Sequence, residues 1–210
     1  ISNFDIKGNH FLQNSQIKSL VAREILGGNI FRANLRLVSN RLRDNPWIEM
    51  AEVGRKIPDR IQIKIKERTP FAKVEMTGGR AFLIDKKAFL IKKIENQEYQ
   101  VLPTIKLVND TDYRIGSSLK TEEVKSGIKF IEKIFSLKNS DHAINFNSIS
   151  MKEGGCFILE TPTVNIRFSQ IRLKENLNKL RIASRIIEKE DLRVKFIDLA
   201  FNDQIVLKLL

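Results

Sequence analysis

The chain has 210 residues, of which 42% are hydrophobic, enough for one or two domains with a substantial core. It carries 37 Lys and Arg against 25 Asp and Glu, a net charge of +12. A basic balance of this size is compatible with nucleic acid, anionic lipid or an acidic protein as partner. The single cysteine excludes an intrachain disulfide, and the two histidines lack companions at metal-ligand spacing.

The first 45 residues predict a short strand and two helices. Residues 4–9 alternate and end at a Gly-Asn turn. A helix then has an apolar stripe formed by Ile17, Leu20, Val21 and Ile25. The stripe of the second helix is formed by Phe31, Leu35, Val38 and Leu42. This helix is expected to end before Pro46, because the residue that precedes a proline is disfavoured in a helix.

Three arginines, Arg32, Arg36 and Arg43, are expected to share the face of the second helix opposite its apolar stripe. Such a charged face is typical of a helix that is open to solvent. A patch that binds anionic lipid headgroups or an acidic partner is the alternative interpretation.

The most specific pattern is a hairpin between Asn45 and Ala72. In its second strand Ile61, Ile63 and Ile65 alternate with polar residues, as in a strand with one buried face. Pro58 lacks an N–H and favours the chain reversal that precedes this strand. The first strand begins at Trp47, which we expect to be largely buried. The order β-α-α-β-β predicts two helices on one face of a three-stranded sheet.

From residue 70 onward the pattern changes to short strands with two helices. Strands are expected at residues 72–76, 82–84, 89–91, 143–151, 156–160 and 164–168. A helix capped by Thr121 has the apolar stripe Val124, Ile128, Ile131 and Phe135. A later helix has the stripe Leu173, Leu177, Leu180 and Ile187. Cys156 lies in an apolar run, which indicates a small buried side chain and not a nucleophile.

The last two strands are expected at residues 194–201 and 204–210. Asn202 and Asp203 between them suit a two-residue hairpin turn. A sheet built outward strand by strand leaves the final strand at an edge, with unpaired N–H and C=O groups. This strand is apolar apart from Lys208, so its edge is either prone to aggregation or a docking strip.

Catalysis and specific nucleic-acid binding are not supported by any motif. There is no glycine-rich phosphate loop, no material for a Ser-His-Asp triad and no metal-ligand spacing. Most of the 13 Phe fall inside apolar runs or helix stripes, as core residues do. We therefore expect no catalytic residue, no cofactor, no metal, no small-molecule substrate and no specific nucleic acid.

The hairpin resembles a known family. Asn45-Pro46-Trp47-Ile48, then Pro58-Asp59, then the strand end Lys66-Glu67-Arg68-Thr69-Pro70-Phe71-Ala72 resemble the extracytoplasmic part of the bacterial cell-division proteins FtsQ and DivIB. Three weaker matches are the strands around Asp85, with Ala88 at a usual glycine, the segment Leu102-Pro103-Thr104-Ile105, and Asp198, Leu199 and Phe201 near the end. Ala200 stands where this closing signature has an arginine, which affects any charge contact made there.

The resemblance implies an α+β chain with a POTRA domain at residues 1–70 and a β domain at residues 71–210, the latter of mainly antiparallel strands with two helices. It implies a non-catalytic divisome scaffold that links early and late septal components and binds FtsB or DivIC together with FtsL. One membrane helix of about 20 apolar residues is expected upstream of Ile1. That helix would anchor the protein in the cytoplasmic membrane, with this region on the extracytoplasmic side at the septum.

The resemblance favours docking by strand addition at the final strand. The expected partner contacts are Phe201, Asn202, Gln204, Ile205, Val206, Leu207 and Lys208. The alternative is a POTRA-containing outer-membrane assembly or secretion component that acts as a polypeptide-binding module. That protein would need several POTRA repeats followed by alternating transmembrane strands. Residues 71–210 do not repeat the first domain, so we expect the division protein.

Overall fold

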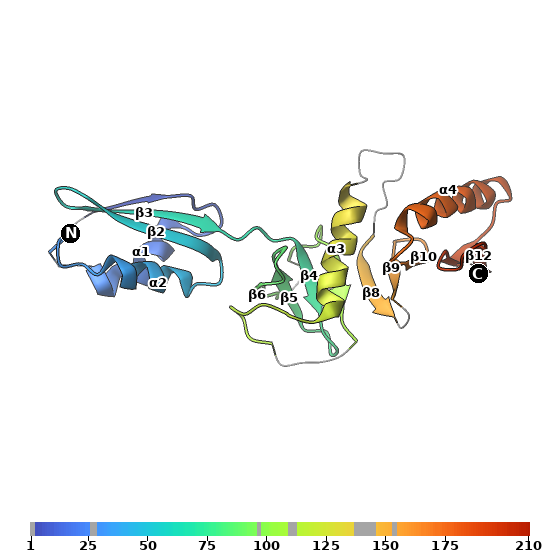
Figure 1. The fold of residues 1–210 in the computed structure, drawn as a ribbon, viewed down its shortest axis with the longest axis horizontal. Coiled ribbons are helices and arrows are strands. Elements are labelled where there is room, and N and C mark those ends of the chain that lie inside the picture. Colours follow the sequence, from blue (N-terminus) through green and yellow to red (C-terminus); the bar gives the residue numbers. More distant parts are fainter. Residues whose placement is uncertain (1–2, 26–28, 96–97, 109–112, 137–145, 153–154) are drawn as a thin grey trace.

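The computed structural model describes residues 3–25, 29–95, 98–108, 113–136, 146–152 and 155–210. These residues form an α+β structure with two separate sheets, as expected from the sequence. The N-terminal sheet with its helices and the larger C-terminal sheet follow one another along the long axis of the molecule (Figure 1).

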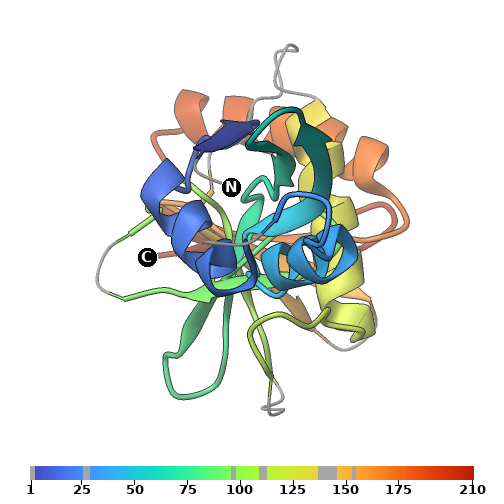
Figure 2. The same cartoon turned by 90° about the vertical axis from the view of Figure 1, so that its left-hand side faces the viewer.

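The N-terminal unit has the expected element order β-α-α-β-β. Its elements are β1 (Asn3–Lys7), α1 (Asn14–Ile25), α2 (Leu35–Arg43), β2 (Ile48–Lys56) and β3 (Arg60–Glu67). The sheet order is β1-β3-β2, in which β1 is parallel and β2 antiparallel to the central strand β3. Figure 2 shows this unit from the N-terminal end of the molecule, with both helices on one side of the strands.

The alternation of apolar and polar residues in β3 provides the apolar face on which the two helices pack. Ile61, Ile63 and Ile65 are buried, because side chains of one parity point to one face of a strand. They pack against the apolar stripes of the two helices, whose buried members are Ile17, Val21, Ile25, Val38 and Leu42. The helical spacing in the sequence is therefore confirmed for these positions.

Two aromatic residues do not lie where the pattern predicted. Phe31 precedes α2 and is 68% exposed, because the helix begins only after Asn34, whose side chain accepts the N–H of Leu37 at 3.1 Å. Trp47 is half-buried at the margin of the core, where its ring stacks on Phe11 at a centroid distance of 4.9 Å. The fully buried residue at the start of β2 is Ile48.

The second sheet has nine strands in the order β12-β11-β10-β9-β8-β7-β4-β5-β6. The strands are β4 (Ala72–Glu75), β5 (Ala81–Ile84), β6 (Leu90–Lys93), β7 (Thr104–Lys106), β8 (Ser148–Lys152), β9 (Cys156–Glu160), β10 (Asn165–Ser169), β11 (Val194–Asp198) and β12 (Val206–Leu209). Five of the eight neighbouring pairs are antiparallel, so the sheet is mainly antiparallel as predicted. The expected start of β8 at Ala143 lies outside the described residues.

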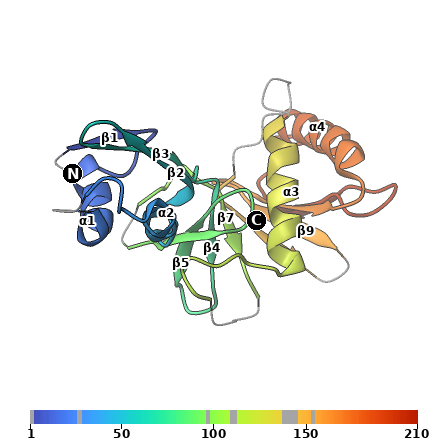
Figure 3. The same cartoon turned by 60° about the vertical axis from the view of Figure 1, so that its left-hand side comes forward.

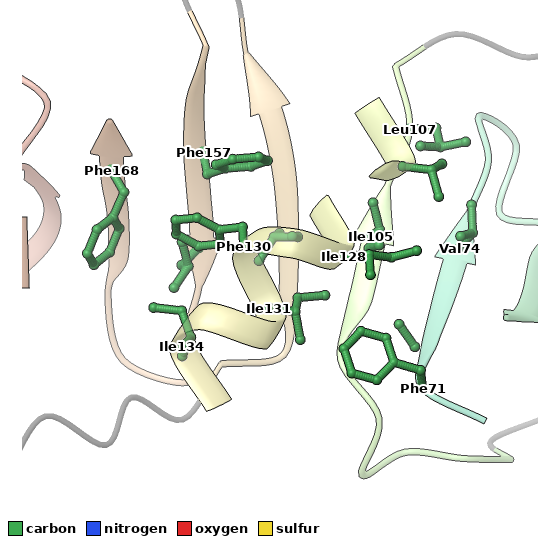
Figure 4. Packing of buried hydrophobic residues seen from close by; sticks show 14 of the residues in the cluster. Phe71, Val74, Ile105, Leu107, Ile128, Phe130, Ile131, Ile134, Phe157 and Phe168 are labelled. Atoms are coloured by element: carbon green, nitrogen blue, oxygen red, sulfur yellow. The ribbon is translucent and has the colours of Figure 1, made fainter. Parts of the chain in front are cut away.

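Two helices account for two of the parallel pairs. The helix α3 (Glu122–Ser136) connects β7 to β8, and α4 (Leu173–Lys189) connects β10 to β11. Parallel neighbours require a long crossover of this kind. The face of α3 that meets the sheet carries Phe130, whose ring lies 4.4 Å from that of Phe157 and 5.9 Å from that of Phe168 (Figure 4). Cys156 is buried, as expected for a small core residue.

The buried hydrophobic residues form two clusters. One belongs to the N-terminal unit and the other to the nine-stranded sheet with α3 and α4. We propose that the two clusters are two domains that meet near residue 70.

Arg68 links the two units. Its N–H donates to the carbonyl of Trp47 at 2.8 Å, while its guanidinium donates to Asp85 at 2.9 Å and lies 3.4 Å from the ring centroid of Phe89. Asp85 also accepts the N–H groups of Lys87 and Phe89, which shapes the turn between β5 and β6. A largely desolvated guanidinium held by a carboxylate and an aromatic face restricts how the two units can turn.

Glu49 on β2 adds a second link. Its carboxylate accepts from Lys87 at 2.6 Å and from Lys66 at 2.9 Å, and these two ammonium groups lower its pKa from 4.5 to about 2. A carboxylate whose pKa is lower in the folded state than in the unfolded state stabilises the fold at any pH above the unfolded-state pKa. This contribution is lost as the pH falls through the folded-state pKa. We expect the stability difference between the wild type and Glu49→Gln to be constant near neutral pH and to shrink between pH 4.5 and about 2.

Urea melts of both proteins at about pH 7 and about pH 3 measure this difference. A difference that stays the same at both pH values would show that the two lysines do not stabilise the carboxylate in the folded state.

Candidate protein-interaction site

The final strand β12 lies at one edge of the nine-stranded sheet, with β11 as its only neighbour among the described strands. This edge position agrees with the expectation from the sequence. In Figure 1 the strand lies near the C-terminus, at the opposite end of the molecule from the N-terminus.

The direction of the backbone N–H groups along β12 follows from one hydrogen bond. The N–H of Leu210 donates to the carbonyl of Arg193 at 2.9 Å, toward β11. Alternate N–H groups of a strand point to opposite sides. The N–H of Lys208 therefore points toward β11, whereas those of Leu207 and Leu209 point to the open side, where a further strand can pair.

The side chains of this strand divide between the core and the surface. Ile205 and Leu207 pack against the large core, so they do not offer an exposed apolar strip. Val206 and Leu209 are 43% and 52% exposed. Leu209 was outside the expected set of contacts, although it belongs to β12 and has both an exposed side chain and an outward N–H.

The connection between β11 and β12 is longer than the predicted two-residue turn. The strands end and begin at Asp198 and Val206, so residues 199–205 form a loop and Asn202-Asp203 do not close a tight hairpin. Asp198 accepts the N–H of Ala200 at 3.0 Å and a bond from Arg167 at 3.1 Å. This carboxylate raises the pKa of Arg167.

A lysine of α4 holds the same loop from the helix side. The ammonium group of Lys179 donates to the carbonyls of Phe201 and Asn202. Phe201 remains 50% exposed. The expected contacts thus fall into two sets, with Phe201, Asn202, Gln204 and Ile205 in the loop and Val206, Leu207 and Lys208 in β12.

Beside this edge, the sheet face opposite the helices is hollowed. A cavity of about 500 Å³ is lined by Val108, Met151, Lys152, Ile158, Arg167 and Phe196. Ile158, Arg167 and Phe196 come from the consecutive strands β9, β10 and β11, while their neighbours Leu159, Ile166 and Ile197 are buried on the other face. The sequence analysis did not predict this cavity. The sequence indicates it only through Ile158 in β9 and Phe196 in β11, which are apolar residues at positions that point away from the core.

The three arginines of the N-terminal unit are only partly brought together. Arg36 and Arg43 are exposed on α2 two turns apart, and so share one face of it. Arg32 precedes the helix, which corrects the expected three-residue face. A role in binding anionic lipid or an acidic partner stays a prediction.

Neither a metal centre nor a membrane span is found in the part of the chain that the structure describes. The described residues hold no group of three His, Cys, Asp or Glu side chains able to bind a metal ion. Among their helices, none combines the length and the apolar character needed to cross a membrane.

Residues 1–68 match the family described as the POTRA domain, FtsQ-type, so the N-terminal unit is a POTRA domain of this class. Most of the chain is also similar to the cell-division proteins named FtsQ and DivIB. It is 27% identical over 158 residues to cell division protein DivIB of Clostridium tetani, an alignment covering 71% of this chain and 57% of that protein. Over 206 residues it is 23% identical to DivIB of Clostridium acetobutylicum, covering 94% and 75%.

A shorter alignment has a higher identity. Cell division protein FtsQ of Rickettsia bellii is 39% identical over 67 residues, which cover 32% of this chain and 25% of that protein. Among solved structures, POTRA1-2 of the periplasmic domain of Omp85 from Anabaena covers 76% of this chain and 92% of its own, at 12% identity and a TM-score of 0.27, a weak likeness in overall arrangement. The chain spans little more than half the length of the Clostridium tetani relative.

Proposed function

We propose that this chain is the extracytoplasmic part of a non-catalytic cell-division protein that binds an FtsB-like or DivIC-like partner together with an FtsL-like partner. A role in cell division is supported by the names of its relatives, and none of those reported above is named as an enzyme. The single observation that carries the binding role is the free edge of β12, with N–H groups aimed away from the sheet.

Binding occurs by addition of a partner strand to β12. Main-chain hydrogen bonds to Leu207 and Leu209 supply affinity, and side-chain contacts at the exposed Val206 and Leu209 supply specificity. The loop that carries Phe201 is held by Lys179 and by Asp198, so the edge is ordered before the partner arrives. Less ordering on binding leaves more of the interaction energy as affinity.

The cavity beside this edge extends the surface. Ile158 and Phe196 provide apolar contact, and Lys152 and Arg167 favour acidic side chains in the partner segment that follows its added strand. The N-terminal unit lies at the other end of the molecule from β12 (Figure 1), so an anchor upstream of this unit would leave the edge facing away from the membrane. We propose that the protein is held in the cytoplasmic membrane at the septum, with both units on the extracytoplasmic side.

Proline substitutions test the edge. Leu209→Pro removes an outward donor and leaves the ladder to β11 intact, so we expect at least about a tenfold loss of affinity for the extracytoplasmic segment of the FtsB-like or DivIC-like protein. Leu209→Ala is the matched control for the lost side chain, and affinity should fall less. Lys208→Pro removes an inward donor and should lower the melting temperature instead.

Pulldown and calorimetry, with circular dichroism of every variant, make this measurement. If folded Leu209→Pro binds the partner segment as tightly as Leu209→Ala does, strand addition at β12 is wrong. Ile205→Pro is not informative, because Ile205 precedes the strand and packs in the core.

A further inference from the structure

The second feature of interest is a groove between α3 and α4. Both helices lie over the nine-stranded sheet, at an angle to one another (Figures 1 and 3). A cavity of about 310 Å³ lies between the C-terminal end of α3 and the start of α4, and a second cavity of about 480 Å³ adjoins it along α3. Lys133 and Ser136 line both cavities, so the two form one groove.

The α3 wall of the groove is one continuous stripe of that helix. Its residues follow helical spacing and are Ser126, Lys129, Phe130, Lys133 and Ser136. The opposite wall comes from the start of α4, with Leu173, Lys174 and Leu177, and from Ile171 just before it. Phe130, Leu173 and Leu177 are buried and form an apolar floor, while Ile171 is 92% exposed at the mouth.

The charges around the groove are unbalanced. Its two acidic residues have basic partners, since Glu132 pairs with Lys86 at 3.3 Å and Glu175 with Arg172 at 4.0 Å. Within the described part of the chain, none of the three lysines Lys129, Lys133 and Lys174 has an ion pair. The three lysines therefore give the lining of the groove a net positive charge.

We propose that this groove binds an acidic segment of a partner polypeptide that inserts at least one apolar side chain beside Ile171. Carboxylates complement the three lysines, and the exposed Ile171 at the mouth favours contact with an aliphatic side chain. A nucleic acid fits less well, because Phe130 is only 3% exposed and offers no face for base stacking. The surface is separate from β12, so this proposal stands or falls independently of strand addition.

A peptide probe tests the groove. The probe is a synthetic peptide of about 15 residues with Glu and Leu at helical spacing, titrated into the isotope-labelled chain and followed by amide chemical shifts. We expect shifts at Lys129, Lys133 and Lys174, and binding that weakens with added salt. A second peptide with Ser in place of Leu should bind at least about tenfold more weakly.

Matched charge reversals separate the groove from net charge. Lys129→Glu/Lys133→Glu should weaken binding of the Glu-Leu peptide by about tenfold or more. Lys120→Glu/Lys125→Glu changes the net charge equally at exposed positions outside the groove, and should change affinity less than about twofold. Ile171→Ser should weaken binding of the Glu-Leu peptide and leave binding of the Glu-Ser peptide unchanged.

Three results overturn the proposal. Equal weakening by both double variants would show attraction by net charge alone. Equal affinity for the Leu and Ser peptides would indicate a general polyanion surface. Shifts confined to β12 and the loop at residues 199–205 would assign the peptide to the sheet edge.

Discussion

Replacement of Gly8 by alanine is expected to destabilise the N-terminal unit by roughly 3–5 kcal/mol, through a backbone clash with added conformational strain. Gly8 has a φ of +88°, a backbone conformation that residues with a side chain rarely adopt. An alanine Cβ at this position would lie 2.0 Å from the carbonyl oxygen of Ile65. That carbonyl belongs to β3, the central strand of the three-stranded sheet. Neither segment can move away without breaking the ladder on one side of β3.

Two other glycines separate the clash from the strain. Gly78 also has a positive φ, of +90°, but nothing lies within 4 Å of an added Cβ, so Gly78→Ala should cost about 1–2 kcal/mol. Gly54 has neither constraint, so Gly54→Ala should stay within about 0.5 kcal/mol of wild type.

Urea melts report these changes. Trp47, the single tryptophan, packs against the core of the N-terminal unit, and its fluorescence follows Gly8→Ala and Gly54→Ala. Circular dichroism follows Gly78→Ala. A cost for Gly8→Ala no larger than that for Gly78→Ala would rule out the close approach to Ile65.

The parts of the fold that could be predicted are those in which the side-chain pattern is local. The stripe of α1 and the alternation of β3 each depend on one element that presents one face to one core. Phe31 shows the limit of this reasoning. Its spacing fits the stripe of α2, yet the cap at Asn34 decides where the helix begins.

Contacts between distant residues decided what the pattern could not. Asn202 and Asp203 suit a tight turn, but the ladder between β11 and β12 ends at Asp198, whose carboxylate binds Arg167 and the N–H of Ala200. The cavity beside β12 depends on four strands whose neighbours are set by the crossover through α4. At Ala88 the structure explains a feature of the sequence comparison. Its φ is 59°, a conformation that glycine adopts readily, and glycine is usual at this position in the family that the chain resembles.

The edge position of β12 could be predicted, because a sheet built outward strand by strand leaves the last of the expected strands at an edge. Which residues of β12 are available to a partner strand could not be predicted. That depends on the hydrogen bond from the N–H of Leu210 to Arg193, which sets the direction of the N–H groups, and on the packing of Ile205 and Leu207 against the large core.

A second large effect is expected at Glu67, which the alternation of β3 places on the same face as Ile61, Ile63 and Ile65. Glu67 is only 8% exposed, and a buried carboxylate is costly unless it is fully hydrogen-bonded. Its oxygens accept three consecutive backbone N–H groups, from His10 at 2.8 Å, Phe11 at 2.7 Å and Leu12 at 2.9 Å. The carboxylate thereby holds the loop between β1 and α1 on the end of β3.

Glu67→Ala removes three charge-assisted bonds and leaves buried donors without an acceptor, so we expect a loss of roughly 3–5 kcal/mol. Glu67→Gln keeps one oxygen but turns an amide NH₂ toward N–H groups, and should cost roughly 1–3 kcal/mol. Glu52→Ala, on the exposed face of β2, is the matched control and should stay within about 0.5 kcal/mol. Urea melts followed by Trp47 are well suited, because its ring stacks on Phe11 in the same loop. Should Glu67→Gln and Glu52→Ala melt alike, the charge of Glu67 has no part in holding the loop, and the burial of this carboxylate must be offset elsewhere.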